Sequence, residues 1–175
     1  QGVNTPDYVN LGLDVSSVAF SDIISRTITV AGNIHGKDEL NLRLGNGVYN
    51  YNDKTLTSVD STTKPVYALD SSYLGGMYAG KISVIATENG VGVRLRGDLV
   101  ANVSDINLNA FGDVEIERAQ AARDIIVQSG AKIIQGKYQT ADRKSLLKAA
   151  RNVDLQASND IDSEIIEAEN NINLT

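Results

Sequence analysis

Hydrophobic and polar positions alternate in a short phrase that occurs four times in the second half of the chain. The four copies cover Asp105–Ala110, Asp124–Ser129, Asn152–Ala157 and Asn171–Leu174. Every second residue of a copy is apolar or small, a period of two that predicts a strand with one buried face. The first two copies begin 19 residues apart, as do the last two, and the middle step is 28 residues. This repeat predicts a solenoid: an all-β, right-handed parallel β-helix with coils of about 19 residues.

Stacking the copies predicts three inward columns of equivalent residues. They are Ile106, Ile125, Val153 and Ile172; Leu108, Val127, Leu155 and Leu174; and the small residues Ala110, Ser129 and Ala157. Asp105, Asp124, Asn152 and Asn171 recur at one turn position, where a short polar side chain can hydrogen-bond nearby backbone. A second, weaker strand follows at a constant offset of eight residues, at Val114, Ile133 and Ile161.

The first half of the chain repeats the pattern less regularly. Further strands are expected at Thr27–Ala31, Leu40–Leu44, Ile82–Ala86 and Val91–Leu95. The stretch from Gly45 to Lys64 is rich in Asn, Tyr, Thr and Ser, and predicts a hairpin or long loop outside the helix. One continuous solenoid is therefore expected, with irregular coils over residues 1–98 and regular repeats over 99–175.

The long middle step points to an insertion at about residues 136–150. Its Thr140–Ala150 part lacks strand alternation and consists largely of helix formers, so it predicts a short helical insertion. The insertion and its flank form a candidate ligand-contact patch for an anionic glycan or a receptor: Lys137, Arg143, Lys144, Lys148 and Arg151. The alternative is a solvated segment whose charges keep the chain soluble and discourage edge pairing.

Composition narrows the classes of function. A net charge of −6 argues against a nucleic-acid partner, which calls for a concentrated basic surface. The chain has no Cys, which excludes disulfides, thiolate nucleophiles and Cys-ligated metals. Aromatic residues make up 5% and Trp is absent, which suits a core of stacked aliphatic rungs. No apolar run approaches the ~18 residues of a transmembrane helix, and Gln1–Asn10 has no signal-peptide pattern.

Catalytic chemistry has weak support in the sequence, although β-helices also host enzymes that act on glycans. Asp113, Glu115 and Glu117 share one strand region, but the residues one period on do not complete a carboxylate cluster. They are expected to be solvated acids of the outer face. His35, the single His, is expected in a loop or turn beside Gly36. We therefore expect no catalytic residue, cofactor or metal site.

Two blocks of sequence carry a resemblance to a known family. They are Leu74–Ile82 running into Ala86–Val93, and Phe20–Arg26 followed by Ala31–Ile34. Together with the variable Asn/Tyr loop between them and the repeats that follow, they resemble the large exoproteins of two-partner secretion. That family includes filamentous haemagglutinin-like adhesins and the toxin-delivery proteins of contact-dependent growth inhibition. The resemblance covers about Phe20 to Val93 specifically and the rest generically.

The resemblance implies a structural role and a location. The chain would be the end of a secretion domain and the first repeats of a shaft, secreted to the bacterial surface by an outer-membrane transporter. The family's Asn-Pro motifs are missing, and Asn4-Thr5-Pro6 does not match them, so transporter contact is expected mainly upstream of this region. Two alternatives stay open: a glycan-active β-helix enzyme, and a module that itself binds a glycan or receptor.

Overall fold

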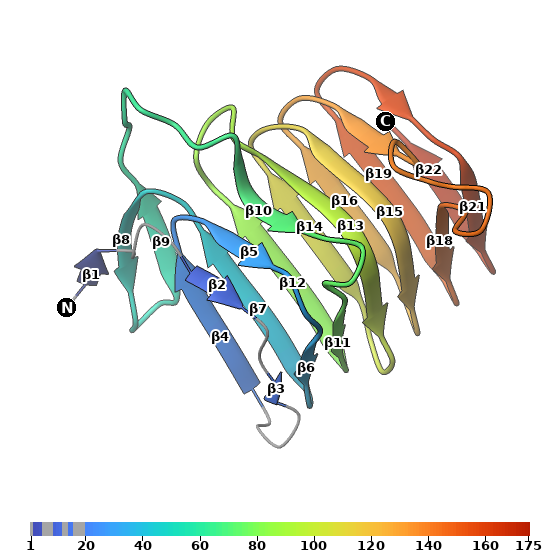
Figure 1. The fold of residues 1–175 in the computed structure, drawn as a ribbon, viewed down its shortest axis with the longest axis horizontal. Helices are drawn as coiled ribbons and strands as arrows, with labels where there is room; N and C mark the ends of the chain where they lie inside the picture. Colours follow the sequence, from blue (N-terminus) through green and yellow to red (C-terminus); the bar gives the residue numbers. More distant parts are fainter. Residues whose placement is uncertain (1, 5–8, 12–13, 16–19) are drawn as a thin grey trace.

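The protein is a parallel β-helix with its N-terminal coils at one end of the stack and its C-terminal coils at the other (Figure 1). The structure, a computed structural model, describes residues 2–4, 9–11, 14–15 and 20–175. Thr5 and Pro6, which bear on the comparison with the Asn-Pro motifs, lie outside the described residues. No helix occurs in the described part of the chain, so no segment there could cross a membrane as a helix.

The first face of the β-helix is a sheet of seven parallel strands that contains the repeated phrase. Its strands are β4 (Phe20–Ser25), β7 (Glu39–Leu44), β12 (Lys81–Ala86), β14 (Ile106–Ala110), β16 (Ile125–Ser129), β19 (Asn152–Ala157) and β22 (Asn171–Leu174). They pair in that order, each with the corresponding strand of the next coil. The strands predicted at Leu40–Leu44 and Ile82–Ala86 are confirmed here.

The other two faces belong to one twelve-stranded sheet, because β13 (Gly92–Ala101) and β15 (Val114–Ala121) run through both. The second face adds β2 (Val9–Leu11), β5 (Ile28–Val30), β10 (Tyr67–Ser71), β17 (Ile133–Gln135) and β20 (Ile161–Asp162). The third adds β3 (Asp14–Val15), β6 (Ile34–Gly36), β11 (Met77–Ala79), β18 (Leu146–Ala149) and β21 (Ile165–Ala168). Each coil thus visits the second, third and first faces in turn.

Seven coils follow from this order in the described part of the chain. Coil 1 comprises β2 to β4, coil 2 comprises β5 to β7, and coil 3 comprises β10 to β12. Coil 4 comprises β13 and β14, and coil 5 comprises β15 and β16. Coil 6 comprises β17 to β19, and coil 7 comprises β20 to β22. The division at residue 98 stays a prediction; β13 crosses that residue, and both sides share the same sheets.

The predicted columns are confirmed in register. Ile106 pairs with Ile125, Ile125 with Val153, and Val153 with Ile172, and the column that begins at Leu108 follows the same order. The members of both columns are buried as far as coil 6. In coil 7, Ile172 and Leu174 lie on the edge strand β22 and are 46% and 47% exposed. The column at Val114, Ile133 and Ile161 is also in register.

The third strand of each regular coil was not predicted. It pairs Ala119 with Leu147 and Leu147 with Ile166, and the pairing of β13 with β15 shifts register just before this face, between Leu95 and Asp98. Small Ala residues hold many of its inward positions, including Ala101, Ala121 and Ala149, which are buried. A pattern that relies on large aliphatic side chains therefore gives little signal for this face.

The turn residues Asp105, Asp124, Asn152 and Asn171 form a ladder between coils. The backbone N–H of Asp124 donates to Asp105 Oδ1 at 2.9 Å, and that of Asn152 to Asp124 Oδ1 at 3.0 Å. The N–H of Asn171 donates to Asn152 Oδ1 at 3.2 Å. The side chains therefore accept hydrogen bonds from the coil that follows, rather than only from their own turn.

The extra-helical hairpin is confirmed. It consists of β8 (Gly47–Asn50) and β9 (Thr55–Ser58), which pair antiparallel, with β1 (Gly2–Asn4) along the other edge of β8. Gly45 begins the departure with a φ of 148°, and a Cβ there would lie 2.4 Å from Thr87 Oγ1. Residues 45–66 are called the hairpin segment below.

An insertion is present between β17 and β18, but the helix predicted at Thr140–Ala150 is wrong. Residues 136–145, called the strap below, form an irregular loop, and the chain then enters strand β18. A single residue, Glu117, lies between the paired positions Ile116 and Arg118 of coil 5, whereas ten residues lie between Gln135 and Leu146 in coil 6. The helix does not form although the residues favour it, because strand pairing and polar contacts with neighbouring coils supply more hydrogen bonds than one isolated helical turn.

Candidate functional site

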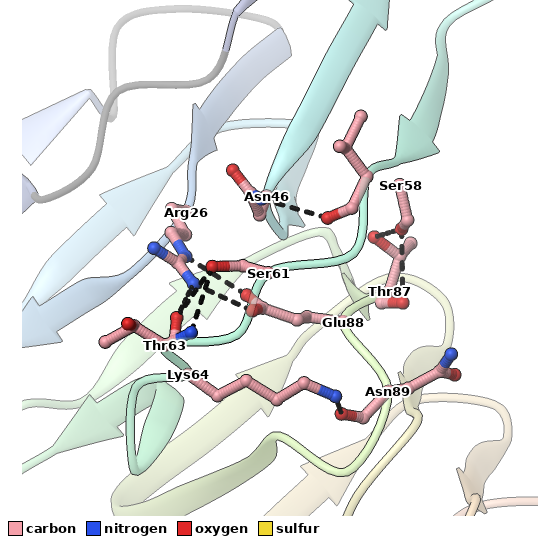
Figure 2. A network of polar contacts seen from close by, with 10 residues as sticks. Arg26, Asn46, Ser58, Ser61, Thr63, Lys64, Thr87, Glu88 and Asn89 are labelled. Carbon is pink, nitrogen blue, oxygen red and sulfur yellow. Dashed lines mark hydrogen bonds and ion pairs between the residues drawn. The ribbon is translucent and has the colours of Figure 1, made fainter.

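The part of the hairpin segment that follows β9, called the returning limb below, is held against the coils by an ion pair and its neighbouring hydrogen bonds (Figure 2). Arg26 Nη2 lies 2.8 Å from Glu88 Oε1, and Arg26 Nε donates to Glu88 Oε2 at 3.2 Å. The same guanidinium donates to the backbone carbonyl of Thr63 at 2.6 Å. The Glu88 side chain is only 4% exposed. This two-point pair joins the turn between β4 and β5 to the turn between β12 and β13, and holds the limb over the coils.

Shorter side chains complete the attachment of the hairpin segment. Ser58 Oγ donates to Thr87 Oγ1 at 2.7 Å, next to the ion pair in sequence. Lys64 Nζ donates to the carbonyl of Asn89 at 2.6 Å, whereas Asn46 Nδ2 closes the base of the segment on itself by donating to the carbonyl of Val59 at 2.9 Å. The base of the hairpin segment is therefore fixed, while β9 keeps mostly exposed side chains.

The strap lies over the second and third faces of coils 4 and 5. Lys137 Nζ pairs with Glu115 Oε1, and the backbone N–H of Tyr138 donates to Glu117 Oε1 at 2.8 Å. Glu115 is 3% exposed and Glu117 is 1% exposed. The expectation of solvated outer-face acids is therefore wrong for these two residues. Asp113 instead accepts from the backbone N–H of Lys132 at 3.0 Å, as a turn residue would.

An arginine held between two tyrosines lies beside these acids. The guanidinium of Arg94 is 4.5 Å from the ring centre of Tyr67 and 5.8 Å from that of Tyr138. Arg94 Nη2 also lies 2.6 Å from Asp70 Oδ2, and this hydrogen bond lowers the pKa of Asp70. Burial, reinforced by Glu115, raises the pKa of Tyr67 to about 12. In this cluster the charge of Arg94 is paired with Asp70 and its guanidinium contacts two aromatic rings. The cluster thereby joins coils 3, 4 and 5 to the strap.

Glu117 is the least satisfied polar group beneath the strap. Its Oε2 atom has no hydrogen-bond partner in the described part of the chain. Burial raises the pKa of Glu117, and the negative charges of Glu115 and Glu164 act in the same direction. The hydrogen bond from Tyr138 and the charge of Arg143 oppose that rise. The ionised form is therefore disfavoured in this position.

The five residues of the predicted ligand-contact patch are separated by the fold. Lys137 and Arg143 reach across neighbouring coils from the strap, and Arg143 Nη2 lies 2.6 Å from Asp98 Oδ1. Lys148 on β18 lies 3.6 Å from Glu167, and Arg151 before β19 lies 3.3 Å from Asp124. Lys144 is exposed on the strap, and its side chain makes no ion pair with the described residues. A ligand-contact role for these residues stays a prediction.

His35 is part of strand β6, so its expected place in a loop or turn is wrong. Its ring stacks on that of Tyr78 with centroids 4.9 Å apart, which makes it an element of coil-to-coil packing. Among the residues that the structure describes, no group of three or more His, Asp or Glu could hold a metal ion. The arrangement as a whole is suited to holding coils together.

Comparison with known proteins identifies the class to which this β-helix belongs. The family model described as the TPS secretion domain matches residues 8–116, more than half of the chain. This range contains coils 1 to 4 and the start of coil 5, together with the hairpin segment. No solved structure gives a significant match.

The chain belongs to the family of two-partner secretion exoproteins, which are secreted and reach the bacterial cell surface. "tRNA nuclease CdiA-2" of Burkholderia pseudomallei strain 1026b is 35% identical over 105 residues, 59% of this chain. "Toxin CdiA" of Yersinia pestis is 37% identical over 103 residues, 58% of this chain. "16S rRNA endonuclease CdiA" of Enterobacter cloacae is 32% identical over 168 residues, 94% of this chain. The matches span 3%, 3% and 5% of these relatives' lengths.

Proposed function

We propose that this chain is a non-enzymatic secretion and stalk segment of a longer exoprotein. In this proposal the segment is exported through an outer-membrane two-partner transporter, with the main transporter contact upstream, and supports a distal toxin region. The observation that carries the proposal is the match to the TPS secretion domain over residues 8–116. The coils continue beyond that range in the same sheets, through coils 6 and 7.

Repetition is the mechanism by which such a segment would act. Each coil adds roughly 4.8 Å to the length of the rod, the usual spacing of paired strands. Each coil also buries aliphatic side chains on the coil before it, as Ile125 does between Ile106 and Val153. A completed coil therefore offers a template to the next, which suits a chain that folds as it leaves the membrane.

A segment exchange tests the proposal. The Enterobacter cloacae relative aligns with 94% of this chain, so its matching segment can be replaced by residues 1–175. With its transporter present, we expect the exchanged protein to accumulate outside the cell, and without the transporter to stay inside. A matched pair sets the control: Leu108→Asp, which places a charge in the core, should block accumulation, while outward-facing Asn107→Asp should not.

The glycan-active alternative predicts a different outcome. The purified chain would shorten acidic polysaccharides, and replacement of Glu115 and Glu117 by Gln would abolish that activity. We expect no shortening. Failure of the exchanged protein to leave the cell, while the unmodified relative leaves it normally, would contradict the proposal.

A further inference from the structure

A coil of a solenoid ordinarily contacts only its two neighbours, so a β-helix can unravel from its ends one coil at a time. The strap departs from this pattern. It belongs to coil 6, between β17 and β18, yet it reaches past coil 5 to coil 4. A contact that skips a coil joins elements that would otherwise open separately.

The anchor on coil 4 is Arg143. Its Nη1 atom donates to the carbonyl of Arg96 at 2.8 Å, and its Nη2 atom lies 2.6 Å from Asp98 Oδ1. Both partners belong to β13, beside the bulge that turns this strand from the second face to the third. Arg118 Nε of coil 5 also lies 3.2 Å from Asp98 Oδ1, so one carboxylate joins three successive coils.

The anchors on coil 5 come from both ends of the strap. Lys137 and Tyr138 engage Glu115 and Glu117 near its start. Near its end, Arg118 Nη1 donates to the carbonyl of Lys144 at 2.6 Å, and Ser145 Oγ donates to the carbonyl of Glu117. The strap therefore covers Glu115 and Glu117, which bind it, and a carbonyl of its own backbone accepts a hydrogen bond from Arg118.

We propose that the strap is a clasp that makes coils 4, 5 and 6 open and close as one unit. It joins coil 4, inside the range matched by the TPS secretion domain, to coil 6 outside it. The clasp closes only when β17 and β18 have paired, because they fix both ends of the strap. Closure thus locks the end of the secretion domain once the next coil is in place. This coupling does not depend on the proposed export route.

Native-state hydrogen exchange on the full 175-residue chain, followed by mass spectrometry at increasing urea, tests the clasp. The reporters are the amides of β14, β16 and β19 on the first face, which belong to coils 4, 5 and 6 and lie in a different sheet from β13 and β15, the strands that the strap engages. In the wild-type protein these amides should share one opening free energy and one urea dependence. Independent opening of β14 and β19 in the wild-type protein would overturn the proposal.

The double variant Lys137→Met/Arg143→Gln removes both cationic anchors. Exchange in β19 should accelerate by at least about tenfold and separate from exchange in β14, while far-UV circular dichroism stays that of a β-helix. Lys144→Met, on the same strap, is the matched control and should change neither rate. Deletion of residues 136–144 leaves Ser145 as the single linking residue, as in coil 5, and should act like the double variant. Unchanged β19 exchange in either variant would overturn the clasp.

Discussion

The hairpin segment 45–66 and the strap 136–145 both interrupt the coil, yet only the hairpin segment carries regular structure of its own. Strands β8 and β9 satisfy each other's backbone, and the segment contacts the coils mainly at its base. The strap has no strand: a few hydrogen bonds close within it, such as that from the Thr140 N–H to the Arg143 carbonyl, and the coils beneath supply others. An irregular insertion must find partners below it, because unpaired backbone groups cannot be buried without cost.

The two attachments also differ in how deeply their charges lie. Arg26 meets a carboxylate that is 4% exposed, as does Lys137 of the strap, whereas Arg143 of the strap meets one that is 41% exposed. Removing one partner of a buried pair leaves an uncompensated charge, while an exposed pair is largely screened by water. The hairpin segment is thus held mainly by one pair with a buried carboxylate, and the strap by one such pair, at Lys137, together with the more exposed pair at Arg143.

The largest effect on stability is expected from a substitution in the core of the coils, which supports both the hairpin segment and the strap. Leu155→Asp places a carboxylate between two rungs at a position that is 1% exposed, and should lower the free energy of unfolding by about 4 kcal/mol or more. Leu174→Asp, in the same column but 47% exposed, should cost less than about 1 kcal/mol. Urea unfolding followed by circular dichroism measures both. Equal stability of the two variants would mean that the column is not buried as described.

The next effect separates the two attachments directly. Arg26→Met should lower the free energy of unfolding by about 3 kcal/mol, because Glu88 is left buried without its cation. Arg143→Met should cost no more than about 1 kcal/mol, because Asp98 keeps water and Arg118. The double variant Arg26→Met/Glu88→Met should regain much of the loss in urea unfolding. If both single variants lose the same stability, the contrast between the two attachments fails.

The sequence was sufficient to predict two faces of the regular coils and the hairpin, and insufficient to predict the third face or how the strap packs. Period-two alternation and the 19-residue step place Ile106 on Ile125 without further information. The strap offers no such period: its contacts join Arg143 to Asp98 and Lys137 to Glu115, pairs set by how the chain folds back across the coils. Glu115 and Glu117 therefore looked solvated, since only the fold brings the strap over them. A useful signal was the excess of cations in the insertion, which matches carboxylates one and two coils earlier.

The pH dependence of stability should distinguish the strap from the hairpin segment. Glu117 has a raised pKa, so its contribution to stability is complete below its ordinary value of 4.5 and is lost as the pH rises through the raised pKa. Glu117→Gln removes this loss and should be more stable than the wild type at pH 8, by about 1 kcal/mol. The gain should shrink toward pH 5. Asp70 acts in the opposite direction but below 3.8, because Arg94 lowers its pKa, so it does not enter this range.

Melting temperatures of the wild type and Glu117→Gln between pH 5 and 8 provide the measurement. Glu88→Gln serves as the comparison from the hairpin segment, and it should be destabilised throughout this range because the ion pair with Arg26 is lost. Parallel melting curves for the wild type and Glu117→Gln would show that Glu117 does not titrate in this range.

The smallest effects on stability are expected at two exposed lysines, Lys64 in the hairpin segment and Lys144 in the strap. Each replacement by Ala should change the free energy of unfolding by no more than about 0.5 kcal/mol, because exposed charges are screened and held loosely. A ligand role would appear instead on a heparin column. Four of the five predicted contact residues are already paired with acids and the net charge is −6, so the wild type should elute below about 0.15 M salt. Retention to higher salt that is lost in Lys144→Ala and kept in Lys64→Ala would support the glycan-contact patch on the strap. Equal elution of all three proteins would argue that the strap serves contacts with its own coils rather than contacts with a glycan.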